Sequence, residues 1–409
     1  MKERVVVTGI GVVSSVGLGV ERFYASLRDG VSGAASVTRF DSAGFDHAQV
    51  CEVKEFEPAR FVRNQSVDDI GLSAQFAVAA TRMGFEDAGL DPQQLQGAEY
   101  PAIFGTTDGE SAPFEALTLQ MHESGSFDPA LLRMVPAQQI ALSVAREFAL
   151  TGEALTISTA CAAGNYALGL GYDMVASGET PIAICGGSDS VCRKTFAGFY
   201  RLGTMAPVAC QPFDQERHGI LTGEGSAVLI LESYSSARAR GARIYAEMLG
   251  YAINCDATHM VAPDRDSIAA CMRTAHQRAG IRAEEVDFVC MHGTGTKAND
   301  VTESEAVRQV FGEHRPKVTS IKSSLGHGMG AASAFGAAAC CLAIDREFLP
   351  PTLQLNVQDP ECDVDVIANH AVSARPRVVQ NDAFAFGGNN SITIFKQVEC
   401  NGKDHHGHA

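Results

Sequence analysis

The stretch Leu155-Thr156-Ile157-Ser158-Thr159-Ala160-Cys161-Ala162-Ala163-Gly164-Asn165 decides how the rest of the chain is interpreted. It begins as a short apolar run typical of a β-strand and continues into small residues that suit a helix, with the change at Cys161. A cysteine at a helix start faces unpaired backbone N–H groups and the positive end of the helix dipole, which both favour the thiolate. The stretch therefore indicates a nucleophilic cysteine; a small buried residue at a strand–helix junction is the alternative.

Length and charge limit the classes of protein to consider. The chain has 409 residues, of which 45% are hydrophobic, and a formal net charge of −16. This length exceeds that of a usual single core, so we expect two packed halves. The negative charge argues against general nucleic-acid binding, which needs a basic surface. Because no uncharged apolar run reaches about 18 residues, we expect no membrane-spanning helix.

Cysteine usage and the lack of a signal-peptide pattern predict a cytoplasmic protein. Twelve cysteines without regular spacing indicate a reducing compartment, and the absence of C-x-x-C pairs argues against structural zinc. The apolar run Val5-Val6-Val7 is interrupted at Gly9 and Gly11, so we interpret it as a first strand and not as a signal peptide. Residues 401–409 are polar, contain three histidines and are predicted to form a disordered tail.

Strand-like and helix-like segments alternate along the whole chain. Apolar runs at 182–184, 226–231, 288–291 and 318–321 are separated by segments with helical spacing. Such alternation is typical of an α/β fold with a mainly parallel sheet. A similar order begins again near Tyr245, so we predict two halves, residues 1–250 and 251–400.

Two histidines follow strands in the second half. His292 begins the stretch His-Gly-Thr-Gly-Thr after the run 288–291, and His327 ends the stretch Lys-Ser-Ser-Leu-Gly-His after the run 318–321. Ligands of α/β sheets bind beyond the carboxyl ends of strands, so we expect both histidines to meet Cys161 in one site. A cysteine with two imidazoles suits chemistry that forms a thioester and then stabilises an enolate or oxyanion.

Together these motifs resemble the β-ketoacyl-acyl-carrier-protein synthases, and most closely the type II elongating class that includes the ketosynthases of bacterial polyketide systems. The similarity covers nearly the whole chain and includes Val6–Gly11, Pro212–Asp214 with Arg217, Gly223–Gly225 and Phe386–Asn390. The resemblance implies a thiolase-like fold, in which two similar α/β halves form a five-layer sandwich with mixed, mainly parallel sheets. It also implies a dimer.

The resemblance implies a decarboxylative Claisen condensation. An acyl group would move from an acyl carrier protein to Cys161, and a malonyl-carrier protein would then lose CO2 and attack the thioester through its enolate. His292 and His327 would promote decarboxylation and stabilise the oxyanion. The substrates would arrive on a phosphopantetheine arm, and neither a metal nor an organic cofactor would be required.

Further residues acquire roles from the same resemblance. The backbone N–H groups of Cys161 and Phe386 would form an oxyanion hole, and the Phe386 side chain would gate the pocket or, alternatively, belong to the core. Lys322, with Asp300 and Glu303 as partners, would hold the His327 loop. Thr294, Thr296 and Phe199 would bind the phosphopantetheine arm or the substrate. Arg60, Arg63 and Arg133 would bind the carrier protein, or alternatively be solvated surface charges.

One turn departs from the family pattern in a way that concerns the substrate. Thr106-Thr107-Asp108-Gly109-Glu110 replaces a glycine-rich apolar turn that, in fatty-acid members, helps to line the acyl pocket across the dimer interface. A carboxylate at Asp108 would be costly against a saturated alkyl chain. We therefore hypothesise a short, polar or unsaturated acyl substrate. In the alternative interpretation, Asp108 points into solvent and is uninformative about the substrate.

Related proteins offer competing functions. Chain-length-factor subunits of polyketide systems share the fold but lack the cysteine, so Cys161 and both histidines argue against a purely structural role. A homodimer and a heterodimer with such a subunit both fit the motifs. Thiolases lack the Lys-Ser-x-x-Gly-His pattern and use a second, late cysteine. Initiating synthases carry one histidine and an asparagine in place of two histidines.

Overall fold

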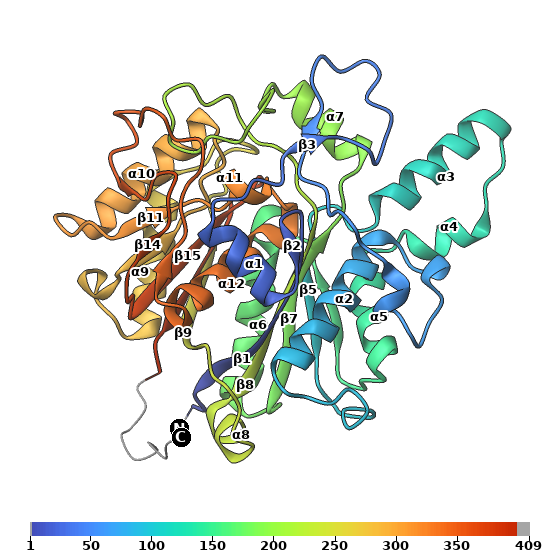
Figure 1. Cartoon of the computed structure of the whole chain (residues 1–409), viewed down its shortest axis with the longest axis horizontal. Helices are drawn as coiled ribbons and strands as arrows, with labels where there is room; N and C mark the ends of the chain where they lie inside the picture. The colour runs from blue at the N-terminus through green and yellow to red at the C-terminus, as the bar shows by residue number, and fades with distance from the viewer. Residues whose placement is uncertain (1, 399–409) are drawn as a thin grey trace.

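Two five-stranded sheets form the frame of the molecule, of which the computed structural model describes residues 2–398 (Figure 1). The predicted tail at 401–409 lies outside the described residues. The first sheet contains, in spatial order, β6 (Ala154–Ile157), β5 (Ala102–Gly105), β7 (Ile182–Asp189), β8 (Gly225–Ser233) and β1 (Val5–Ser14). The second contains β11 (Lys317–Thr319), β10 (Phe288–Cys290), β15 (Val378–Phe384), β16 (Asn389–Lys396) and β9 (Ala246–Cys255).

Both sheets repeat one pattern of strand directions. In the first, β5 is parallel to β6 and β7, whereas the pairs β7–β8 and β8–β1 are antiparallel. In the second, β10 is parallel to β11 and β15, whereas β15–β16 and β16–β9 are antiparallel. The predicted similarity of the two halves is therefore visible in the strand pairing.

The two sheets meet edge to edge near the predicted boundary. β1 pairs with β9 over Val5–Val7, which joins both sheets; with the short strands β2 (Gly17–Leu18) beside β1 and β13 (Asp365–Val366) beside β11, they form one 12-stranded sheet. Residue 250 lies inside β9, which also pairs with β16. The division at residue 250 stays a prediction.

Helices form three layers around the sheets (Figure 1). The layers consist of α2 (Leu72–Asp87) and α5 (Gln139–Phe148) outside the first sheet, α6 (Ala163–Ser177) and α12 (Ala332–Asp345) between the sheets, and α9 (Arg265–Ala279) and α10 (Lys297–Phe311) outside the second. α12 is apolar on all sides and almost wholly buried, as a central helix must be. Each layer packs on its sheet through its own hydrophobic cluster. This arrangement is the predicted five-layer sandwich.

Shorter elements complete the fold. They are α1 (Val20–Arg28), α3 (Ser111–Ser124), α4 (Pro129–Met134), α7 (Arg193–Arg201), α8 (Tyr234–Ala239) and α11 (Lys322–Leu325), the strands β2 (Gly17–Leu18), β3 (Ala35–Ser36), β4 (Gln49–Val50), β12 (Phe348–Leu349), β13 (Asp365–Val366) and β14 (Val372–Ser373), and the 3-10 turns η1 (Pro58–Arg60), η2 (Val67–Asp69), η3 (Ala160–Ala162), η4 (Ala283–Glu285) and η5 (Met329–Ala331). Across residues 2–398, every helix is too short or too polar to cross a membrane.

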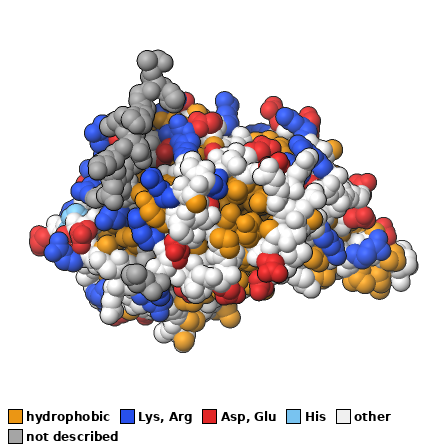
Figure 2. Space-filling model, turned by 90° about the horizontal axis from the view of Figure 1, so that it is seen from below, with side chains coloured by type: hydrophobic (Ala, Val, Ile, Leu, Met, Phe, Trp, Pro, Cys, Tyr) orange, Lys and Arg blue, Asp and Glu red, His pale blue; other side chains and the backbone are white. Residues whose placement is uncertain are grey.

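The α3–α4 hairpin stands away from the body of the molecule (Figure 1). Figure 2, seen from below, shows hydrophobic side chains at the right-hand end, where this hairpin projects. Five large hydrophobic side chains of the hairpin are exposed, namely Phe114, Leu119, Met121, Phe127 and Leu132. The hairpin therefore presents apolar side chains that no part of residues 2–398 covers.

Glycines allow the segments around the site to approach closely. An added Cβ at Gly105, the last residue of β5, would lie 2.2 Å from the carbonyl carbon of Ala163. β5 and the start of α6 therefore pack backbone against backbone, which places Cys161 immediately beyond the carboxyl ends of the parallel strands.

Candidate active site

A pocket of about 240 Å³ contains the three predicted catalytic residues. Cys161, His292 and His327 all line it, as do Thr294, Thr296, Phe199 and Phe386. Cys161, His292 and His327 come from both halves of the chain and follow strands β6, β10 and β11, respectively, whereas Phe199 lies in α7 and Phe386 follows β15. The topology thus brings together side chains that are far apart in the sequence.

Cys161 lies in η3, between β6 and α6, and is 6% exposed. The preceding residue, Ala160, has a φ of 48°, a left-handed conformation that costs a non-glycine residue about 1 kcal/mol or more. Burial raises the pKa of the Cys161 thiol to about 12, although the Lys322 ammonium opposes this shift. The sequence predicts a thiolate from the helix start, but burial outweighs that effect.

Lys322 determines which ring nitrogen of His292 carries the proton. The Lys322 ammonium donates to the carbonyl oxygen of His292, and its Nζ lies 3.4 Å from His292 Nδ1. An ammonium group can only donate, so Nδ1 accepts and the ring proton is on Nε2. His292 therefore presents an Nε2–H donor to a ligand in the pocket.

His327 is held in the same tautomer by the backbone. The Met329 N–H donates to His327 Nδ1 at 3.1 Å, which leaves the proton on Nε2. The two imidazole centroids lie 5.6 Å apart, with their planes at 82°. Burial and the nearby Lys322 ammonium hold the pKa of both imidazoles well below the usual 6.5. Both rings are consequently neutral donors at neutral pH.

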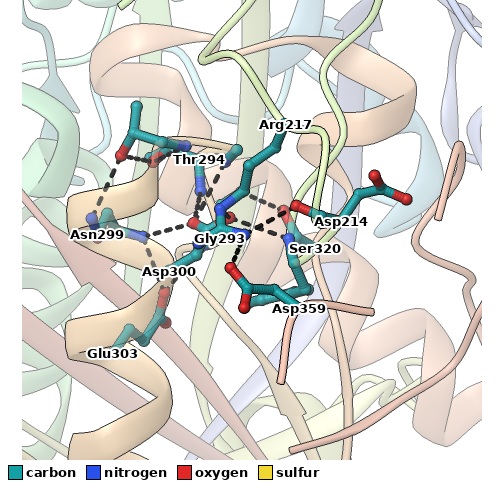
Figure 3. A network of polar contacts seen from close by, with 12 residues as sticks. Asp214, Arg217, Gly293, Thr294, Asn299, Asp300, Glu303, Ser320 and Asp359 are labelled. Atoms are coloured by element: carbon teal, nitrogen blue, oxygen red, sulfur yellow. Dashed lines mark hydrogen bonds and ion pairs between the residues drawn. The ribbon is translucent and has the colours of Figure 1, made fainter. Parts of the chain in front are cut away.

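Two carboxylates of α10 hold the turn that follows His292 (Figure 3). Glu303 accepts hydrogen bonds from the backbone N–H groups of His292 (2.6 Å) and Gly293 (2.8 Å). Asp300 accepts from the N–H groups of Thr294 (3.0 Å) and Gly295 (3.2 Å). Because α10 begins directly after the turn, carboxylates in its first turns face back onto these N–H groups.

This geometry corrects one prediction from the sequence. We predicted that Lys322, Asp300 and Glu303 hold the loop of His327, but all three side chains contact the turn of His292. Burial raises the pKa of Glu303 to about 7, while the N–H groups of Gly293 and His292 oppose the shift.

Arg217 is a buried residue of this network to which the sequence analysis gave no role. Its Nη1 donates to Asp359 (2.6 Å) and to the carbonyl oxygen of Asp214 (2.8 Å), and its Nε lies 3.4 Å from Asp300 Oδ2 (Figure 3). The guanidinium thereby links the segment around Asp214 to the carboxylate that holds the Thr294 turn. The Pro-Phe-Asp-x-x-Arg motif was the available signal.

Phe386 lies at the pocket rim and outside the core. Its side chain is 37% exposed, and its ring packs against Phe199 with centroids 5.7 Å apart. The Gly387 N–H donates to the carbonyl oxygen of Met260 at 2.7 Å, so the loop after β15 rests on another rim segment. The alternative of a core phenylalanine is therefore wrong.

The position of Asp108 matches neither of the two alternatives predicted from the sequence, a carboxylate lining the acyl pocket or one pointing into solvent. It does not point freely into solvent, since its carboxylate accepts from Thr195 Oγ1 (2.6 Å) and Lys194 Nζ (3.2 Å) and is 9% exposed. Nor does it line the pocket that contains Cys161. Its charge still contributes to the raised pKa of Cys161.

The three arginines predicted to bind a carrier protein are exposed, and none lines the pocket. Arg60 lies in η1 and Arg133 in α4, and the Arg63 side chain donates to the carbonyl oxygen of Arg60.

Among residues 2–398, no group of three or more His, Cys, Asp or Glu side chains is placed to hold a metal ion.

Comparison with known proteins gives a consistent match over nearly the whole chain. The family model "Beta-ketoacyl synthase, N-terminal domain" matches residues 2–237, and "Beta-ketoacyl synthase, C-terminal domain" matches residues 245–356. The 3-oxoacyl-[acyl-carrier-protein] synthase 2 of Synechocystis sp. is 34% identical over 97% of this chain and 99% of its own length. The putative polyketide beta-ketoacyl synthase 1 of Streptomyces halstedii is 35% identical over 98% and 99%.

Solved structures agree with these matches. The ishigamide ketosynthase/chain length factor superposes with a TM-score of 0.96 at 50% identity, covering 98% of this chain and 100% of that chain. A type II polyketide acyl-carrier protein in complex with its ketosynthase bound to the hexaketide gives a TM-score of 0.89 at 30% identity, over 97% and 100%.

Proposed function

Because this chain belongs to the beta-ketoacyl synthase family, we propose that it is the catalytic ketosynthase subunit of a complex supplied by an acyl carrier protein. Family membership confirms the resemblance, the thiolase-like fold and the acyltransferase class expected from the motifs. The observation that most supports a catalytic role is the joint presence of Cys161 and two neutral Nε2–H imidazoles in one pocket.

In the first step, the acyl group is transferred to Cys161. The Cys161 thiol loses its proton as its sulfur attacks the carbonyl carbon of the acyl thioester, and the phosphopantetheine sulfur leaves as a thiol by taking up that proton. The oxyanion formed during attack would accept hydrogen bonds from the backbone N–H groups of Cys161 and Phe386. Thr294 and Thr296 line the pocket with hydroxyl groups 2.9 Å apart and would bind the arm.

In the second step, decarboxylation generates the carbon nucleophile. The bond between the malonyl α-carbon and its carboxylate breaks, CO2 leaves, and the electron pair is delocalised onto the thioester oxygen. The Nε2–H groups of His292 and His327 would donate to this oxygen, and their neutrality keeps them as fixed donors. The enolate carbon then attacks the acyl carbonyl, a carbon–carbon bond forms, and Cys161 is released as a thiolate.

The open edge of the first sheet supports pairing with a second subunit. Within the described residues, β6 is an end strand bound only to β5, and the nearby α3–α4 hairpin exposes its apolar side chains. We assign this surface to a homologous ketosynthase-like subunit, and the 50% identity to the ishigamide ketosynthase/chain length factor favours a heterodimer over a homodimer. Light scattering after co-expression with a chain-length-factor subunit should give a one-to-one complex. A stable homodimer that excludes this subunit would contradict the assignment.

The carrier protein would bind near Arg60, Arg63 and Arg133. Carrier proteins are acidic, so exposed arginines favour the encounter. Arg63→Glu should raise the KM for acyl carrier protein about tenfold at low salt, and Arg282→Glu, at another exposed arginine, serves as the control. Unchanged turnover in Arg63→Glu would remove this residue from the docking surface.

The acyl group that the enzyme accepts is proposed to be short, polar or unsaturated. The reason is the family resemblance: in fatty-acid members the corresponding turn helps to line the acyl pocket across the dimer interface, and in this chain that turn carries the Asp108 carboxylate, which does not line the Cys161 pocket of a single chain. Acylation rates with enoyl and polar donors should exceed those with saturated donors of about eight carbons or more. A preference for long saturated chains would refute this hypothesis.

We further propose that the condensation needs no metal or organic cofactor and takes place in the cytoplasm. The steps above use only side chains and substrate groups, and the eleven cysteines within residues 2–398 are free. Treatment with EDTA should leave the condensation rate unchanged. Inactivation that a divalent cation reverses would contradict the proposal.

Reconstitution tests the proposed function. The purified chain with its partner subunit, an acyl carrier protein donor and malonyl-carrier protein should yield β-ketoacyl-carrier protein and CO2 in equal amounts. The Cys161→Ala variant should form no condensed product. Equal product from wild type and variant would refute the assignment of the nucleophile.

A further inference from the structure

A buried carboxylate, Asp189, lies where several segments behind the active site cross. It is the last residue of β7 and is 0% exposed. One carboxylate oxygen accepts from Thr106 Oγ1 (2.6 Å) and the Asp108 N–H (3.0 Å), and the other accepts from the Thr107 N–H (2.9 Å) and the Gly330 N–H (2.6 Å). Asp189 therefore ties the turn after β5 to η5, which is 141 residues away from it in the chain.

The surroundings leave η5 no room to move. An added Cβ at Gly330 would lie 2.4 Å from Thr106 Cα, and one at Gly187 would lie 2.5 Å from the Gly330 carbonyl oxygen. η5 is thus pressed between β7 and the turn after β5, and Asp189 supplies the acceptor for its central N–H.

This contact is directly connected to His327. The residue before Gly330, Met329, has a φ of 50°, which is a strained conformation for a methionine. The N–H of Met329 donates to His327 Nδ1 and so determines both the ring orientation and the tautomer. The bond from Gly330 to Asp189 holds the chain on the far side of the strained residue, so it maintains the geometry of that donor.

We propose that Asp189 is a positioning residue for His327, and that it acts by holding the turn from His327 to Gly330. It touches neither the pocket nor the reacting atoms. Glu303 accepts directly from the His292 N–H, whereas Asp189 acts on His327 only through the Gly330 N–H. The proposal rests on the proposed function, in which His327 stabilises the enolate.

If Asp189 acted through the pKa of Cys161 and not through His327, its removal would speed acylation and would not slow decarboxylation. The Asp189 carboxylate contributes to the raised pKa of Cys161, so its removal favours the thiolate. If Asp189 acts through His327, its loss slows decarboxylation while acylation of Cys161 stays the same or becomes faster. General damage to the fold would slow both half-reactions together.

The experiment measures the two half-reactions separately in the assembled enzyme. Asp189→Ala removes all four acceptor contacts, and Asp189→Asn keeps one acceptor oxygen as a variant that is easier to fold. We expect decarboxylation of malonyl-carrier protein to fall on the order of 100-fold in Asp189→Ala and about tenfold in Asp189→Asn. The rate of acylation by an acyl-carrier protein should stay within about threefold of the wild-type rate or rise. Asp87→Asn, a half-buried carboxyl that accepts from the Ile10 N–H at 2.8 Å, is the matched control and should change neither rate.

Repeating the Asp189 substitution in a protein that lacks His327 distinguishes a positioning role of Asp189 from a general structural role. In a His327→Ala protein, Asp189→Asn should have no further effect on the residual decarboxylation rate. The inference is overturned if Asp189→Asn decarboxylates at the wild-type rate, if both half-reactions fall equally, or if the loss persists without His327. A wild-type complex that performs neither half-reaction would instead refute the proposed function, and this inference with it.

Discussion

Replacing Glu303 by glutamine tests how the turn of His292 is held. One oxygen of the Glu303 carboxylate accepts a hydrogen bond from the backbone N–H of His292. The other accepts from the backbone N–H of Gly293 and from Asn299 Nδ2. A glutamine has one acceptor oxygen, and its NH2 group must face an N–H donor. The less costly orientation leaves only the backbone N–H of His292 without an acceptor.

The expected magnitude follows from this count. One buried N–H without a partner costs about 1–3 kcal/mol, so the free energy of unfolding of Glu303→Gln should fall by that amount. Displacement of the adjacent imidazole should lower the rate of malonyl-carrier-protein decarboxylation on the order of 100-fold, since small misplacements of catalytic groups have effects of that size.

Guanidinium chloride unfolding and a decarboxylation assay measure both effects. Glu305→Gln is the control, because this residue lies on the same helix and is exposed. It should change the free energy of unfolding by less than about 0.5 kcal/mol. Wild-type stability together with a wild-type rate in Glu303→Gln would refute the reasoning.

Three further predictions concern charge and packing. In Glu303→Gln, which lacks the carboxyl group of pKa about 7, the decarboxylation rate should stay constant from about pH 8 to about pH 6, because the pKa values of His292 and His327 lie well below 6.5 and the neutral donors persist as the pH falls through that value; a half-maximal rate near 6.5 in this variant would contradict this. Arg217→Met leaves Asp300 without its buried cation and should lower the free energy of unfolding in guanidinium chloride by about 3–5 kcal/mol, whereas a loss below about 1 kcal/mol would contradict the role of the ion pair. Gly105→Ala places a Cβ 2.2 Å from the backbone at the start of α6 and should cost about 1–3 kcal/mol and slow acylation; an unchanged melting temperature and acylation rate would show that the backbone adapts.

The α/β class and the repeat of two similar halves were predictable because they follow from local patterns, whereas the five-layer sandwich was implied by the family resemblance. Apolar runs alternate with helical periods twice along the chain, and the structure shows the same strand order in both sheets. The meeting of Cys161, His292 and His327 was also predictable, because each residue follows a strand and the carboxyl ends of parallel strands lie together.

Contacts between segments that are distant in sequence were not predictable in the same way. The Gly330 N–H reaches a carboxylate 141 residues away, and Arg217 reaches Asp359 across 142 residues. No local period encodes such pairs. For the same reason, the sequence analysis connected Glu303 with the wrong histidine, because motif spacing does not reveal which turn a side chain faces. The effect of burial on the pKa of Cys161 likewise depends on the folded pocket.

The most direct test of the central claim is intact-mass analysis of the purified complex after incubation with acyl-carrier protein. The account predicts one acyl adduct per ketosynthase chain, located by peptide mapping at Cys161 and absent from Cys161→Ala. An adduct on any other cysteine, or none with acetyl, saturated, enoyl or polar donors, would contradict the claim that Cys161 is the nucleophile of a ketosynthase.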